Sequence, residues 1–148
     1  MTCWGNAEHA RLGYPGLNGA DVGDNEAPAA IGYVEIGGEA LAAGQNHTCV
    51  LLVGGAVRCW GDTSRGQLGL ASIERIGDDE HPSDAPTLRL SRPAIDIEAG
   101  SEHTCALLDD GTLQCWGFNQ FGQLGYGHTE DIGDDEHPEQ AGVIELRR

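Results

Sequence analysis

Apolar and polar residues alternate along several short segments of the chain, which is the pattern of half-buried β-strands. Residues 95–100 read IDIEAG, and the shorter runs LRL and VIEL keep the same two-residue period. HTCALL at 103–108 and LQCWG at 113–117 flank DDG, in which Gly111 suits the left-handed position of a three-residue hairpin loop. No segment sustains a period of 3.6 residues, so we expect short helices or none.

This pattern recurs at a fixed interval of 56 residues. The string CWG occurs at 3–5, 59–61 and 115–117, HTC occurs at 47–49 and 103–105, and IGDDEHP occurs at 76–82 and 132–138, with VGDNEAP at 22–28 as a diverged first copy. One unit then has four strands: IDIEAG, HTCALL, LQCWG, and a fourth read as VIELR at 143–147 or TLRL at 87–90. Four short antiparallel strands repeated at such an interval are typical of a β-propeller blade.

We therefore predict an all-β protein, a partial β-propeller of four-stranded antiparallel blades. The chain begins at the third strand of one unit, so we expect about two and a half blades: a half blade over 1–37 and full blades over 38–92 and 93–148. Closed propellers have about 4–8 blades, and an open arc would leave strand edges and apolar faces uncovered. Two alternatives stay open: copies assemble head to tail into a ring or filament, or the chain is a fragment of a longer propeller.

The stretch HTCALLDDGTLQCWGFNQFGQLGYG at 103–127 resembles the repeat of the regulator-of-chromosome-condensation family, with a His, small apolar strand residues, a DG turn, a Trp-Gly pair and GQLG. The resemblance extends over essentially the whole chain and implies a β-propeller, most often of seven blades. It implies that His47 and His103 hold neighbouring backbone by hydrogen bonds rather than acting as ligands or bases. The paired cysteines and the IGDDEHP insertion depart from the family pattern and suggest an outlying bacterial branch.

The three tryptophans, Trp4, Trp60 and Trp116, recur at one strand position with a glycine after each. We expect them to pack between blades, with a sugar-stacking surface as the alternative.

Four of the five cysteines form two pairs within the predicted hairpins. If DDG is a three-residue loop, Cys105 lies directly opposite Cys115, and the same count places Cys49 opposite Cys59. Opposed Cβ atoms lie about 4.5–5.5 Å apart, and a modest adjustment reaches disulfide distance. We predict these two disulfides, with reduced cysteines or a metal site as alternatives. Disulfides would indicate an oxidising compartment, hence an extracellular or cell-surface location.

Cys3 occupies the CWG position of the first unit, which has no HTC segment before it. We predict that Cys3 is unpaired or bonded to another chain.

The chain carries 24 acidic residues against 8 Lys and Arg, and its formal net charge is −16. Binding to phosphate backbones needs clustered basic residues, so this balance argues against a nucleic-acid partner. No apolar run approaches the roughly 20 residues of a membrane span, and the first ten residues have no character of a signal peptide.

The IGDDEHP loops each gather three carboxylates, the kind of ligand that Ca²⁺ prefers. A possible cation site would use Asp78, Asp79 and Glu80, or Asp134, Asp135 and Glu136. Turn formation by Asp and an acidic protein-binding rim are the alternatives, and we expect no other cofactor.

Motifs for phosphate binding, serine hydrolysis and zinc proteolysis are missing from the sequence. We therefore expect a non-enzymatic repeat module that binds a protein partner or copies of itself. A lectin-like or Ca²⁺-dependent surface binder is the alternative.

Overall fold

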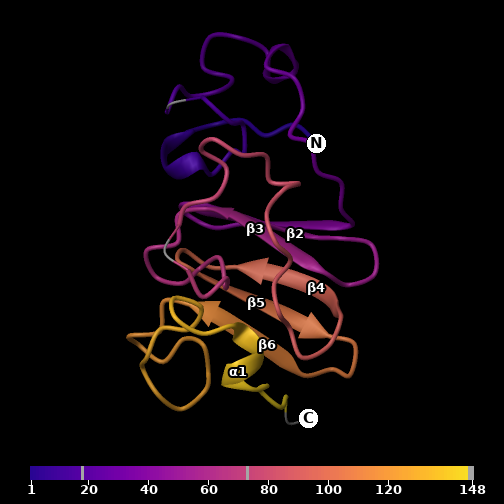
Figure 1. Ribbon diagram of the computed structural model, residues 1–148, viewed down its shortest axis with the longest axis vertical. Helices are drawn as coiled ribbons and strands as arrows, with labels where there is room; N and C mark the ends of the chain where they lie inside the picture. The colour runs from indigo at the N-terminus through magenta and orange to yellow at the C-terminus, as the bar shows by residue number, and fades with distance from the viewer. Residues whose placement is uncertain (18, 73, 147–148) are drawn as a thin grey trace.

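The computed structural model describes residues 1–17, 19–72 and 74–146, and it contains two three-stranded antiparallel sheets (Figure 1). The first sheet has the order β1 (Ala40–Ala43), β2 (His47–Leu51) and β3 (Val57–Gly61), and the second has β4 (Ala94–Ala99), β5 (His103–Leu108) and β6 (Leu113–Gly117). Within these described ranges, helical segments are limited to two 3₁₀ turns, Glu8–Ala10 and Pro28–Ala30, and to α1, Pro138–Ala141. The predicted all-β class with short helices is confirmed.

None of the helices in the described ranges has the length and apolar character needed to cross a bilayer.

The register of both hairpins follows the prediction. Cys105 pairs with Cys115 across β5 and β6, and Cys49 pairs with Cys59 across β2 and β3. Both pairs are disulfide-bonded, with Cα–Cα distances of 4.0 and 4.1 Å respectively. Gly111 takes a φ of 85° in the DDG loop, as the left-handed position requires. The hydrophobic period and the loop length thus suffice to place the cysteines opposite each other.

The predicted fourth strand of each blade is reduced to a short contact. Ile144 and Leu113 exchange backbone hydrogen bonds of 2.8 and 2.9 Å, and one unit earlier the Leu88 N–H donates to the Val57 carbonyl at 2.8 Å. Neither segment is a strand in the described residues, and Arg147, the last residue of VIELR, lies outside them. Each blade is therefore a three-stranded sheet with one segment held beside its outer edge.

The side chain of Gln114 explains why this segment does not form a longer ladder. Gln114 is fully buried, and its Oε1 accepts the Ser91 N–H at 2.8 Å. Its Nε2 donates to the carbonyls of Pro138 at 3.0 Å and Gly142 at 2.9 Å. These backbone groups are paired with a side chain instead of a neighbouring strand, so the polar groups are satisfied without a regular ladder.

The two sheets stack face to face along the longest axis of the molecule, in the order of the chain, and the two termini lie at opposite ends (Figure 1). The main core lies between the sheets. Its fully buried members include Cys49, Val57, Cys59, Ala106 and Leu108. The last unit adds Trp116, Leu124 and Ile132 to the same cluster. The units therefore form an open stack in which each sheet covers one face of the next.

In the first unit, the backbone around Gly5 has the same geometry as the third strand of a complete unit, although it belongs to no sheet in the described residues. Gly5 bridges Val22 as Gly61 bridges Ile76 in the next unit. The φ angles of Gly5 and Gly61 are 110° and 109°, a region that favours glycine. The backbone from Gly5 to Val22 thus repeats the path that the chain takes from Gly61 to Ile76 in the next unit.

Candidate functional site

The tryptophan of each complete unit is anchored to the unit before it. The indole N–H of Trp60 donates to the Arg11 carbonyl at 3.0 Å, and that of Trp116 donates to the Gln67 carbonyl at 3.0 Å. Both side chains are fully buried, which removes them as a sugar-stacking surface. Trp4 occupies the same place in the first unit and is 65% exposed, and no described residues cover it as the preceding units cover Trp60 and Trp116.

A glycine in the preceding loop allows this close approach. A Cβ on Gly69 would lie 3.0 Å from the Trp116 ring, and a Cβ on Gly13 would lie 2.8 Å from the indole nitrogen of Trp60. The corresponding glycine of the last unit is Gly125, whose nearest neighbour to such a Cβ is Ile144 of its own unit at 3.7 Å. In the described part of the chain, no tryptophan packs against the loop around Gly125, whereas Trp60 and Trp116 pack against the equivalent loops around Gly13 and Gly69.

His47 joins the two sheets. Its Nε2 is hydrogen-bonded to the Thr104 hydroxyl at 2.8 Å, and its Nδ1 has no partner among the described residues. Burial, and secondarily the charge of His103, lower the pKa of His47 to about 4, against an opposing effect of Asp62. The resemblance implies a structural hydrogen-bonding role for this histidine; the partner of its ring is a side-chain hydroxyl of the next unit and not the expected neighbouring backbone.

Among the described residues, no threonine hydroxyl lies beside His103 as Thr104 lies beside His47. His103 is partly exposed, and burial lowers its pKa.

Each end of the stack therefore carries one half of the contact that joins the units inside it. At the amino-terminal end, Leu41 is 50% exposed, whereas Ile97, which lies at the same place in the next sheet, is 3% exposed. At the carboxy-terminal end, Phe121 in the last GQLG loop is 86% exposed. One end offers the indole N–H of Trp4 and apolar side chains, and the other offers the loop of Gln123, whose carbonyl accepts no hydrogen bond among the described residues. This pair of end faces is the candidate functional site.

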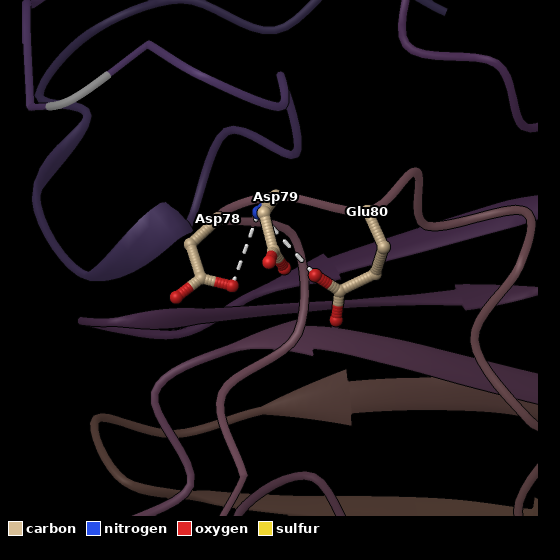
Figure 2. Close-up of side chains that lie close together, drawn as sticks. All are labelled: Asp78, Asp79 and Glu80. Atoms are coloured by element: carbon tan, nitrogen blue, oxygen red, sulfur yellow. Dashed lines mark hydrogen bonds between the residues drawn. The ribbon is translucent and has the colours of Figure 1, made fainter.

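The acidic loops bring their carboxylates together as the sequence suggests. The ligand atoms of Asp78, Asp79 and Glu80 lie within 4.8 Å of one another, and so do those of the loop 134–136. In Figure 2 the carboxylates of Asp78 and Glu80 converge on the backbone N–H of Asp79, at 3.1 and 3.3 Å. At least part of their role is therefore to close the turn.

In both acidic loops partial burial raises the pKa of the glutamate, Glu80 or Glu136. Partial burial, followed by the carboxylates of Asp135 and Asp134, raises the pKa of Glu136 to about 7. Like charges held this close make the ionised cluster costly without a compensating cation.

Among the cysteines that the structure describes, Cys3 alone forms no disulfide, and it is half-buried. Its backbone is held by a residue that the sequence reasoning missed: the Tyr14 hydroxyl accepts the Cys3 N–H at 3.1 Å and lies 3.2 Å from its carbonyl. Tyr126 holds Cys115 in the same way, at 3.0 and 3.2 Å. The signal was present in the sequence, because ARLGY and GQLGY both end in tyrosine.

Comparison with known proteins gives one consistent family. The profile of the regulator of chromosome condensation (RCC1) repeat matches residues 54–107 and 110–145, and a second profile of the same description matches 39–67 and 94–123. The chain is 32% identical over 128 residues to the ultraviolet-B receptor UVR8 of Arabidopsis thaliana. The matched region covers 86% of this chain and 27% of that protein. The chain is 32% identical over 144 residues to the probable E3 ubiquitin-protein ligase HERC3 of Homo sapiens, covering 97% and 12%.

Solved structures agree on the fold. Yeast RCC1 (Prp20), crystallised with Kap60, superimposes with a TM-score of 0.67 at 18% identity, covering 97% of this chain and 32% of that one. A second structure of Prp20p from Saccharomyces cerevisiae, studied for binding to Gsp1p and histones, gives 0.64 at 19% identity, covering 97% and 33%. The chain thus spans about a third or less of these proteins, and about a quarter or less of the two curated relatives.

Proposed function

Because the chain belongs to the RCC1 repeat family, we propose that it is a non-enzymatic propeller module that acts as a scaffold for protein–protein contacts. In this proposal its open arc is completed into a ring or filament by further copies or further repeats. The names of the relatives support an interaction role, since they include a receptor, ubiquitin ligases and a protein crystallised with Kap60. Fold likeness does not carry over any single partner.

The observation that carries the proposal is the mismatch between equivalent positions inside and at the ends of the stack. Trp60 and Trp116 are fully buried against the preceding unit, whereas Trp4 is 65% exposed. The carbonyl of Gln123 stands where that of Gln67 accepts the Trp116 N–H. A head-to-tail contact would pair Trp4 of one copy with Gln123 of another. Such heterologous contacts generate rings when the rotation closes and filaments when it does not.

The mass of the purified chain in solution, measured by light scattering over a range of concentration, tests the proposal. We expect multiples of 15.6 kDa that grow with concentration. The substitution Trp4→Ser should shift the assembly toward monomer. Val53→Ser is the matched control, because Val53 is 81% exposed in the turn between β2 and β3, away from both ends. A monomer at every concentration would reject self-assembly, and equal effects of both substitutions would reject the end-face contact.

The location is proposed as extracellular or cell-surface, since the two disulfides support an oxidising compartment. Thiol alkylation of the native protein before any reduction tests this. Modification at Cys3 alone is the expected result, and modification of the paired cysteines would contradict it.

A second candidate function is binding of Ca²⁺ by the acidic loops, which the crowding of three carboxylates in each loop favours. Titration calorimetry with CaCl₂ should then give a signal that Asp134→Asn with Asp135→Asn reduces. A titration without heat or saturation would remove this candidate and leave the scaffold proposal unaffected.

A further inference from the structure

The two contacts between successive units are built differently. The first contact joins the first unit to the unit of β1–β3, and the second joins that unit to the unit of β4–β6. In the second contact, a Cβ on Gly133 would lie 2.4 Å from the Gly66 carbonyl oxygen. The Ala71 N–H donates to the Gly133 carbonyl at 3.1 Å, and Arg65 forms an ion pair of 3.7 Å with Asp131. Backbone and side-chain contacts together close the second contact.

The first contact carries different residues at the same places. The 56-residue spacing puts Pro15 where the second contact has its backbone N–H donor, and proline has no such group. The Gly16 N–H donates instead to the Asp78 carbonyl at 2.9 Å, one residue further along each loop. The same spacing puts His9 and Arg75 where the second contact has its ion pair. The first contact therefore lacks both interactions that close the second.

The loops of the first contact consequently stand further apart. A Cβ on Gly77, the equivalent of Gly133, would lie 3.3 Å from the Ala10 carbonyl oxygen, against 2.4 Å at the second contact. A cavity of about 530 Å³ lies here, within the size range of small-molecule sites. Its apolar lining includes Leu12, Tyr14 and Leu17.

The backbone that lines this cavity is strained. His9 and Ala10 have φ angles of 60° and 61°, and the equivalents of Ala10 in the other units are Gly66 and Gly122, both at 73°. A residue with a Cβ is disfavoured in this left-handed region, whereas glycine is not. Strain of this kind is often found at ligand-binding sites.

The charged residues of the cavity indicate the chemistry of a ligand. The Arg75 side chain has no hydrogen bond or ion pair among the described residues, so its charge is uncompensated there. A ligand carboxylate would form a bidentate pair with this guanidinium. Two carboxylates, Glu8 and Asp78, line the same cavity and would repel a plain anion. A ligand that carries an ammonium beside its carboxylate matches both signs of charge.

We propose that the cavity of the first contact binds a free α-amino acid with an apolar side chain. The ligand carboxylate pairs with Arg75, and its ammonium lies beside Glu8 and Asp78. The ligand side chain packs against Leu12 and Leu17. This inference goes beyond the scaffold role and does not depend on it, so a chain that stays monomeric in light scattering would leave the site standing.

Thermal unfolding of the intact protein tests the site, with each of the twenty L-amino acids added at about 10 mM. We expect L-leucine and other apolar amino acids to raise the melting temperature by several degrees. Isocaproate and isoamylamine are leucine without its ammonium and without its carboxylate, and neither should raise it. The absence of a shift with every amino acid would overturn the site. An equal shift with isocaproate would overturn the pairing of the ammonium.

The substitution Arg75→Gln tests the carboxylate contact. It should weaken L-leucine binding at least about tenfold in titration calorimetry, because a charge-assisted pair is lost. Arg89→Gln is the matched control, since it removes the same charge from an exposed residue outside the lining of the cavity. Equal effects of the two substitutions would overturn the role of Arg75.

A double variant tests the location of the site. His9→Arg with Arg75→Asp introduces the ion pair of the second contact into the first. L-leucine binding should be lost, while the circular dichroism and melting temperature of the ligand-free protein stay as in the parent. This readout separates closure of the cavity from loss of the fold. Binding that survives in the double variant would overturn the proposed location.

Discussion

Removal of the crosslink between β5 and β6 gives the most quantitative prediction. In the double variant Cys105→Ala with Cys115→Ala, the strands keep their pairing and lose only the covalent bond. The two cysteines are 10 positions apart. In the chain-entropy treatment, a closed loop of about 10 residues restricts the unfolded chain by about 2.7 kcal/mol at 25 °C. We therefore expect the free energy of unfolding to fall by about that amount.

The assay is urea unfolding followed by the fluorescence of the buried tryptophans. The pair Cys49 and Cys59 supplies a matched control, because its separation is also 10 and the entropy effect is the same. Similar losses at both sites would support the entropic origin. A loss below about 1 kcal/mol in both double variants would refute the reasoning, since it would mean that the crosslinks do not restrict the unfolded chain.

Two further predictions concern the contact between units. The pKa of His47 falls from its ordinary value of 6.5 to about 4, so the unfolded chain binds an extra proton between these values. The free energy of unfolding should then decrease by about 3 kcal/mol as the pH falls through this window, and unfolding curves near pH 7 and pH 4 should show a smaller difference for His47→Gln. Gly69→Ala should lower the melting temperature much more than Gly127→Ala: both glycines have positive φ, but only a Cβ on Gly69 meets Trp116. Equal shifts for the two alanine variants would mean that backbone strain alone accounts for the loss.

The repeat and the hairpin register were predictable from the sequence, because both depend on short-range spacing. A two-residue period with the DDG loop fixes which residues face each other, and this placed Cys105 opposite Cys115 correctly. The shortness of the fourth segment in the last unit was not predictable, because the Gly142 carbonyl beside it is paired with the Gln114 amide instead of with a strand. A glutamine at one strand position gives no local sign that its amide will reach two distant segments.

The contacts between units could not be predicted from the spacing of residues along the sequence either. His47 and Thr104 meet because one sheet lies over the next, and the sequence does not state that geometry. Trp4 and Trp60 stand in the same CWG string, yet one is exposed and the other is fully buried. Their difference is decided by the neighbouring unit and not by the residues beside them.

Hydrogen exchange at the three indole N–H groups, resolved by ¹⁵N NMR, tests most directly whether the ends of the stack are two halves of one contact. In dilute protein we predict that Trp60 and Trp116 are protected, since each side chain is fully buried and donates to a backbone carbonyl, and that Trp4 exchanges freely. At high concentration Trp4 should gain protection as a second copy covers it. An indole of Trp4 that exchanges freely in assembled protein, or one of Trp60 that exchanges as fast as Trp4, would contradict the account.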